Sequence, residues 1–124
     1  MSYPKLGLTF DEVSESNAKR CARWHGTFPN RTNDDFSGGD WANAMQGEAG
    51  EAGNVVKKLR RLELGLASQN NGTEGELMEK LSKEIGDTFI YLDLLAQYYG
   101  LDTGECIRQA FNQVSEREGF PERI

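Results

Sequence analysis

The sequence predicts an all-α fold, a bundle of four helices in which one domain covers residues 1–124. Three observations support this prediction. Apolar residues recur with a helical period in four segments, and none of these segments alternates as a half-buried strand does. Two segments open with a Thr-x-x-Glu capping box. Each segment is followed closely by a glycine, which is the residue that most often ends a helix.

The first two predicted helices are separated by a long connection. The capping box at residues 9–12 starts the first helix, which is expected to run to about Trp24. Glycines and a proline then mark a long irregular loop, which is either part of a ligand pocket or disordered. This loop carries His25, Phe28, Arg31 and Phe36. The second helix is expected to open near Asp40 and to end at Gly65, after a basic run that complements the helix dipole.

Local signals also bound the third and fourth predicted helices, which are joined by a short turn. A polar loop at residues 68–72 leads to the capping box at residues 73–76, and the third helix is expected to continue to Tyr99 and to stop at Gly100. Asp102 or Thr103 caps the fourth helix, which ends before residues 119–121. One face of this helix is apolar and carries Cys106, Ile107, Ala110, Phe111 and Val114.

Charge and composition restrict the class of protein. With 20 acidic and 14 basic side chains the net charge is −6, so no surface is expected to bind nucleic acid. An acidic protein that handles an anionic nucleotide needs cations between the two. Two cysteines and no apolar leader favour a cytoplasmic protein. No segment reaches the roughly 18 apolar residues of a membrane span, so no membrane partner is expected.

Two acidic residues lie on the apolar face of the second predicted helix. At about 100° per residue, Glu48 lies in the middle of the apolar stripe and Glu51 about 60° away, at its edge. The apolar residues around Glu48 are Trp41, Ala44, Met45, Ala52, Val55, Val56, Leu59 and Leu62.

The third predicted helix repeats this arrangement. Glu84 lies in the apolar stripe and Asp87 about 60° away. The residues around Glu84 are Leu77, Leu81, Ile85, Thr88, Tyr91, Leu92, Leu95 and Tyr99. Four acids in a core need a cation, because an unpaired buried carboxylate costs several kcal/mol or takes up a proton. Either acid pair alone is more typical of a solvated helix, but two pairs in two apolar stripes favour a metal site.

Oxygen ligands without histidine or cysteine favour Mg²⁺ or Mn²⁺ over zinc, and several carboxylates can hold two or more ions roughly 3.5–4 Å apart. Such a site suits phosphoryl chemistry, in which water is the nucleophile and one carboxylate, plausibly Glu51, acts as the base. His25 is the only histidine, so neither a histidine metal site nor a Ser-His-Asp hydrolase is expected.

Most of the chain resembles the MazG-like all-α nucleoside triphosphate pyrophosphatases, in particular small stand-alone members that are often encoded by phages. The resemblance is carried by Gly47-Glu48-Ala49-Gly50-Glu51, Asn54-Val55-Val56-Lys57-Lys58, Glu84-Ile85-Gly86-Asp87, Tyr91-Leu92, Asp40-Trp41 and residues 111–121. Many relatives have a basic residue at the position of Ala110, so one phosphate contact of the family is not expected here.

The resemblance implies both a fold and an activity. It implies a four-helix bundle that assembles as a homodimer or homotetramer, with Mg²⁺ as the cofactor and Mn²⁺ as a possible substitute. The substrate would be a (deoxy)nucleoside triphosphate, for example a purine deoxynucleotide such as dGTP, and the products a nucleoside monophosphate and pyrophosphate. The metal ligands and catalytic residues would be Glu48, Glu51, Glu84 and Asp87.

Further residues are candidates for contacts to the nucleotide, although surface polarity or ordinary packing explains each of them about as well. Lys58 lies about 20° from Glu51 on the helix wheel, and Tyr91 follows Asp87 by one turn. The complete set is Lys58, Tyr91, Arg108, Asn112, Asn17, Arg20, Trp24 and Trp41. A metal-stabilised bundle that only binds a nucleotide or a protein partner remains the alternative to an enzyme.

Overall fold

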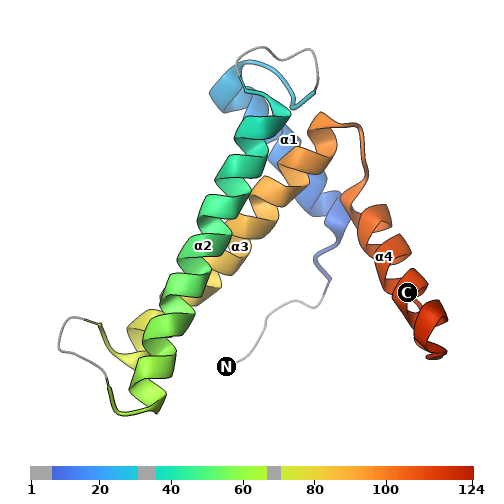
Figure 1. The fold of residues 1–124 in the computed structure, drawn as a ribbon. Coiled ribbons are helices and arrows are strands. Elements are labelled where there is room, and N and C mark those ends of the chain that lie inside the picture. Colours follow the sequence, from blue (N-terminus) through green and yellow to red (C-terminus); the bar gives the residue numbers. More distant parts are fainter. Residues whose placement is uncertain (1–6, 31–35, 67–70) are drawn as a thin grey trace. The chain divides into compact units, whose positions relative to one another are not determined.

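The computed structural model describes residues 7–30, 36–66 and 71–124. These residues form four helices and no strands, in the order α1 (Phe10–His25), α2 (Gly38–Glu63), α3 (Glu74–Tyr98) and α4 (Thr103–Glu118) (Figure 1). The all-α prediction is confirmed. Within the described ranges, every helix is too short or too polar to span a lipid bilayer. Arg31 and most of the predicted loop at residues 68–72 lie outside the described residues.

The predicted helix starts are present as hydrogen-bonded caps. Thr9 Oγ1 accepts a hydrogen bond from the backbone N–H of Glu12, and the Glu12 carboxylate accepts one from the backbone N–H of Thr9. Asp102 caps α4 by accepting from the backbone N–H of Glu105 at 2.9 Å. Such caps satisfy backbone groups that a helix end leaves unpaired. The local sequence therefore sets the starts of α1 and α4.

The helix ends agree with the prediction to within one or two residues. α1 ends at Gly26 with φ 74°, and α4 ends at Gly119 with the same φ, a left-handed conformation that glycine adopts without a steric penalty. α2 begins at Gly38, two residues before Asp40. A Cβ atom on Gly38 would collide with the ring of Tyr99, so this start requires a glycine.

The described contacts divide the chain into two compact units, and each is described by itself. The first comprises the residues up to Gly38 and those from Asp93 onward, and the second comprises residues 39–92. In the second unit α2 and α3 run side by side (Figure 1). Its buried apolar side chains are Trp41, Val55 and Leu77. The Trp41 ring from α2 lies 6.2 Å from the Tyr91 ring of α3, measured between centroids.

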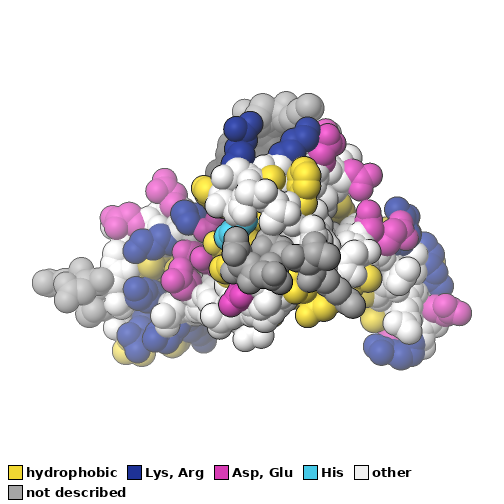
Figure 2. All heavy atoms as spheres, turned by 90° about the horizontal axis from the view of Figure 1, so that it is seen from above, with side chains coloured by type: hydrophobic (Ala, Val, Ile, Leu, Met, Phe, Trp, Pro, Cys, Tyr) yellow, Lys and Arg dark blue, Asp and Glu magenta, His cyan; other side chains and the backbone are white. Residues whose placement is uncertain are grey.

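Part of the predicted inward stripes is exposed, which corrects the prediction. The exposed members are Val56, Ile85, Leu92 and Tyr99. On the helix wheel Val56 lies about 80° from Glu48, and Ile85 lies about 100° from Glu84. An arc of that width extends beyond the face that one neighbouring helix can cover. Figure 2 shows hydrophobic side chains reaching the surface among acidic and basic ones.

In the first unit, one buried carboxylate joins three helices. Asp93 is 1% exposed and lies in the last part of α3. It accepts hydrogen bonds from the hydroxyl groups of Ser14 on α1 and Thr103 on α4, the latter at 2.6 Å. The side-chain amides of Asn17 and Gln97 donate to its other oxygen at 2.9 and 2.8 Å. Four neutral donors thus compensate a charge that is removed from water.

These hydrogen bonds decide the ionisation of Asp93. Burial alone would raise the pKa of its carboxyl group. The donors Ser14, Thr103, Asn17 and Gln97 outweigh burial and hold the pKa below the usual value of aspartate. Each of them stabilises the ionised form, which accepts hydrogen bonds from every side. Asp93 therefore remains a carboxylate in the folded protein.

We predict that Asp93→Asn lowers the free energy of unfolding at pH 7 by about 2–4 kcal/mol, because the amide group directs a donor at groups that are themselves donors. The difference from wild type should be complete above about pH 5 and should shrink below about pH 4. Asp93 has a lower pKa in the folded than in the unfolded chain, so acid removes its contribution. Urea unfolding of both proteins across this range measures the difference. A difference that grows on acidification would contradict this account.

Candidate metal centre

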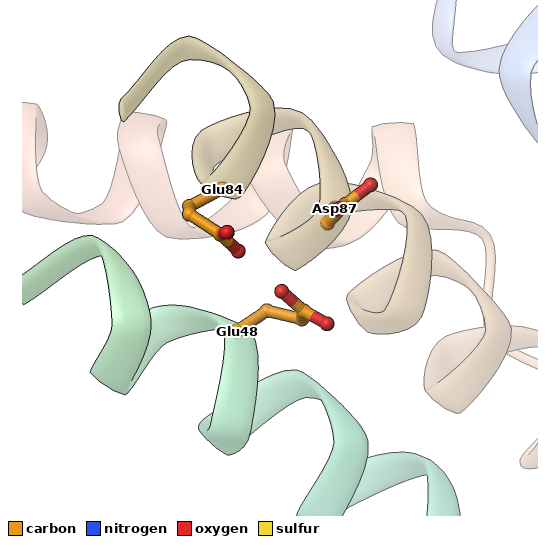
Figure 3. A group of neighbouring side chains, drawn as sticks. All are labelled: Glu48, Glu84 and Asp87. Carbon is orange, nitrogen blue, oxygen red and sulfur yellow. The ribbon is translucent and has the colours of Figure 1, made fainter. Parts of the chain in front are cut away.

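Three carboxylates converge between α2 and α3. Glu48 extends from α2 towards Glu84 and Asp87 on α3, as Figure 3 shows. One oxygen from each of the three side chains lies within 4.8 Å of the other two, and all three residues are half-buried. The predicted convergence of acids from two neighbouring helices is therefore present in the described structure.

Buried residues of the same helices bring Glu48 to this position. Trp41 and Val55 each lie seven residues, or about two helical turns, from Glu48, so the three share one face of α2. Trp41 is 3% exposed and packs against Tyr91 of α3, while Val55 is also buried. On α3, Glu84 and Asp87 are three residues apart and lie on adjacent turns. Packing of the apolar side chains thus forces Glu48 towards both acids.

Crowding changes the acidity of Glu84. The side-chain interaction with Glu48 is the largest cause that raises the pKa of Glu84, followed by burial and by the negative charge of Glu48. Glu51 and Lys83 act in the opposite direction but do not cancel the effect. A raised pKa means that the ionised form is disfavoured in the folded chain. The cluster therefore favours any positive charge that can enter it.

The donor set fits a hard divalent cation. Glu84 Oε2 is fully buried and forms no hydrogen bond with any described group, so one carboxylate oxygen lacks compensation. Ligand oxygens on an octahedral Mg²⁺ lie about 3–4.2 Å apart, given a metal–oxygen distance of about 2.1 Å. The three carboxylate oxygens lie within 4.8 Å of one another, so small rotations of the side chains would bring them to that spacing. The chemistry of the ligands and their spacing both suit Mg²⁺ or Mn²⁺.

Glu51, the fourth predicted ligand, lies at the edge of the group. It is exposed and does not belong to the set of three oxygens, but it acts on Glu84 and lowers its pKa. The exposure of Glu51 departs from the prediction that all four acids face the core, because a residue about 60° from the centre of the stripe lies at the border with solvent. An exposed carboxylate next to a metal centre is suited to exchange protons with water.

Lys83 was not singled out by the sequence pattern, yet it contacts the centre. Its ammonium group forms an ion pair with Asp87 Oδ2, one helical turn away. The i,i+4 spacing of Lys83 and Asp87 was the available signal. It carries little weight alone, because such pairs are common on exposed helices.

The other residues of the second unit that were predicted to contact the nucleotide differ in how buried they are. Trp41 is buried and packs against Tyr91, so its ring is not available to stack on a nucleotide base. Tyr91 is half-buried, and Lys58 is half-buried with no ion pair to another described residue. Lys58 lies seven residues beyond Glu51, about 10 Å further along the axis of α2.

Five residues that were predicted to contact the nucleotide belong to the first unit. Asn17 is buried and donates to Asp93, and Asn112 forms hydrogen bonds of 3.0 and 2.9 Å with the backbone of the last residue of the chain. Arg108 is paired with a glutamate on its own helix at 3.0 Å. Arg20 lies over the ring of Trp24, whose side chain is 72% exposed. Of these five, only the Arg20–Trp24 pair presents an aromatic surface to solvent.

The glycines near the acids on α2 are not packed by the described chain. Nothing lies within 4 Å of a Cβ atom built on Gly47, Gly50 or Gly53. Close packing within this chain therefore does not account for them, and each costs roughly 1 kcal/mol relative to alanine in a helix. The backbone beside Glu48 and Glu51 is left open to another molecule.

No protein-family model matches the sequence, and a search of the curated proteins finds no match either. The resemblance to MazG-like pyrophosphatases therefore stays a prediction that rests on the motif residues alone.

We predict opposite effects of Glu84→Gln with and without metal. In metal-free protein the variant should melt about 2–5 °C above wild type, because the amide removes a disfavoured charge beside Glu48. Wild type should gain up to about 2.7 kcal/mol at a Mn²⁺ concentration 100 times its Kd, and the variant should lose most of this gain. Thermal unfolding in chelator and in Mn²⁺ measures both.

The matched control for this experiment is Glu79→Gln, which removes the same charge from an exposed position on α3. It should respond to Mn²⁺ as wild type does. A Glu84→Gln variant that melts below wild type in chelator would show that the carboxylate is well compensated without a metal.

Proposed function

We propose that this chain is a Mg²⁺-dependent nucleotide pyrophosphohydrolase that converts a (deoxy)nucleoside triphosphate to the monophosphate and pyrophosphate. The observation that carries the proposal is the group of three carboxylate oxygens within 4.8 Å of one another. One of these acids, Glu84, also has a buried oxygen that forms no hydrogen bond within the described part of the chain. Two helices supply an oxygen-only ligand set, which is typical of phosphoryl-transfer sites. The resemblance to MazG-like proteins supports the same reaction.

Glu48, Glu84 and Asp87 would hold the metal, with Glu51 completing the ligand set for a second ion. When bound, Mg²⁺ neutralises the triphosphate, polarises the attacked phosphorus and acidifies the attacking water. Glu51 would accept the proton of that water, because its carboxylate is exposed and adjacent to the group. Lys58 would bind the departing phosphates, and Tyr91 would pack against the sugar. Attack at the α–β linkage then releases pyrophosphate.

The substrate class follows from the resemblance to small phage-type members. A purine deoxynucleotide such as dGTP is the first substrate to test, in a cytoplasmic setting. Both cysteines are free thiols, which is compatible with that setting.

The competing function is a metal-stabilised helical bundle that binds a nucleotide or a protein partner without turnover. Asn17 and Trp41, both expected to contact the nucleotide, are instead buried in packing, so neither function gains these two contacts. The two functions differ in what Glu51→Gln does. It should abolish turnover but leave nucleotide binding largely intact in the enzyme, whereas it should change nothing in a binding module.

We predict that wild type with Mg²⁺ releases pyrophosphate from at least one common (deoxy)nucleoside triphosphate. Glu84→Gln should lower this rate at least about 100-fold, equivalent to about 2.7 kcal/mol of lost transition-state stabilisation. Glu79→Gln should stay within about twofold of wild type, because Glu79 is exposed and outside the carboxylate group. A coupled pyrophosphate assay across the eight common triphosphates measures the rates. Absence of turnover with every substrate, in Mg²⁺ and in Mn²⁺, would refute catalysis.

The proposed enzyme is a homodimer or a homotetramer. Along α3 the exposed apolar residues Met78, Ile85, Phe89 and Leu92 are spaced seven, four and three residues apart. They fall within an arc of about 60° on the helix wheel, which is the width of a helix-pairing seam. Glu84 lies about 100° from Ile85, so this seam does not include the carboxylates. A second copy of the chain would cover the seam.

We predict that Ile85→Glu dissociates the assembly, because it places a charge in the centre of that seam. Light scattering coupled to size exclusion should give wild type a mass of at least twice the 13.9 kDa of the chain and the variant a mass near 13.9 kDa. Leu64→Glu changes an equally exposed leucine outside α3 and should leave the mass of wild type unchanged. A monomeric wild type would exclude this assembly.

A further inference from the structure

The ion pair between Lys83 and Asp87 lies at the edge of the carboxylate group. Both residues are on α3, one turn apart, and the ammonium group contacts Asp87 Oδ2. The Lys83 side chain is 72% exposed and that of Asp87 is 34% exposed. The lysine therefore approaches the acids from the solvent side, where a metal ion and a phosphate would also arrive.

The ammonium group of Lys83 lies beside the three acids. Its ion-pair partner Asp87 belongs to the set of carboxylates whose oxygens lie within 4.8 Å of one another. Among the described residues, no other lysine or arginine forms an ion pair with these three acids. Lys83 is thus the counter-ion that the chain itself supplies to the centre.

The same ammonium group obstructs a divalent cation. A lone pair of Asp87 that accepts a hydrogen bond from Lys83 is not available to a metal, and a fixed positive charge beside the site repels a second one. The obstruction is reversible, because lysine has a long flexible stem and this one is exposed. Rotation of the stem frees Asp87 and leaves the ammonium group beside the centre.

We propose that Lys83 is an exchangeable counter-ion of the three carboxylates. Its ammonium group releases Asp87 when a metal ion binds, and it then binds a phosphate oxygen of the ligand. This inference rests on the proposed function, because it requires a metal at the three acids and an anion above it. Lys83 thus weakens binding of the metal alone and strengthens binding of the anion in the presence of metal. Binding of the two ligands becomes coupled through one side chain.

Titration calorimetry with Mn²⁺ alone tests the first half of this inference. Lys83→Gln should bind Mn²⁺ about three- to tenfold more tightly than wild type, because Asp87 no longer has a competing partner. Lys83→Arg keeps the charge and should bind Mn²⁺ as wild type does. Lys80→Gln is the matched control, since it removes a lysine charge from an exposed position on the same helix that forms no ion pair among the described residues. It should change the affinity by less than about twofold.

Binding of inorganic pyrophosphate at saturating Mg²⁺ tests the second half. Lys83→Gln should bind pyrophosphate about three- to tenfold more weakly than wild type, whereas Lys80→Gln should not differ from it. Opposite signs for metal and anion in one variant support the exchange. Equal effects of Lys83→Gln and Lys80→Gln, or an unchanged Mn²⁺ affinity in Lys83→Gln, would overturn it.

The same titrations separate this inference from the proposed function. If wild type binds Mn²⁺ and hydrolyses triphosphates but Lys83→Gln shows neither effect, only the role of Lys83 is refuted. If wild type binds no Mn²⁺, the proposed metal centre is refuted, and the exchange is refuted with it.

Discussion

Repulsion between carboxylates held together by the packing of α2 and α3 is the constraint on which the proposed chemistry depends. Trp41 packs against Tyr91 of α3, Val55 is buried, and Glu48 shares their face of α2. The apolar contacts that stabilise the hairpin therefore also force Glu48 towards Glu84 and Asp87. Separation of the acids would require unpacking of the helices, so a bound cation is the less costly way to relieve the repulsion. This is why metal binding is expected to stabilise the fold as well as to supply the chemistry.

Asp93 is a carboxylate whose hydrogen-bond acceptors are all satisfied by groups of the protein itself. Four neutral donors surround it, and its pKa is lowered although it is almost fully buried. Glu84 is less buried, yet its pKa is raised, and one of its oxygens has no hydrogen-bond partner among the described residues. The degree of burial therefore does not explain the opposite pKa shifts of the two residues. The difference lies in the neighbours, which are hydrogen-bond donors around Asp93 and another acid beside Glu84, and it makes Glu84 the stronger candidate for a functional site.

Local signals were sufficient to predict the helices, because capping boxes and left-handed glycines act within a few residues of each helix end. The acids at positions 48, 84 and 87 were also predictable, since their helical spacing places them in apolar stripes. The width of those stripes was wrong. Ile85 lies about 100° from Glu84, on a second apolar face that α2 does not cover, and periodicity alone does not separate two adjacent apolar faces. The Asp93 network was missed for a different reason, because Ser14 and Asn17 are 79 and 76 residues away in the chain.

The group of three carboxylates lowers the stability of a protein of this size. A helical hairpin that only had to fold would gain from leucine at positions 48 and 84, which would extend the apolar stripes around Trp41 and Leu77 without charge repulsion. The chain instead holds acids there, adds Lys83 as a partial counter-ion and leaves three glycines on α2 uncovered beside them. The acids and the glycines lower the stability of the isolated chain, and together with Lys83 they leave charge or backbone accessible to a cation and an anionic ligand. Stability that is lost at one place in the structure without a gain in packing is typical of a functional site. The combination of these losses around one point on α2 and α3 is therefore stronger support for a ligand site than the acids alone.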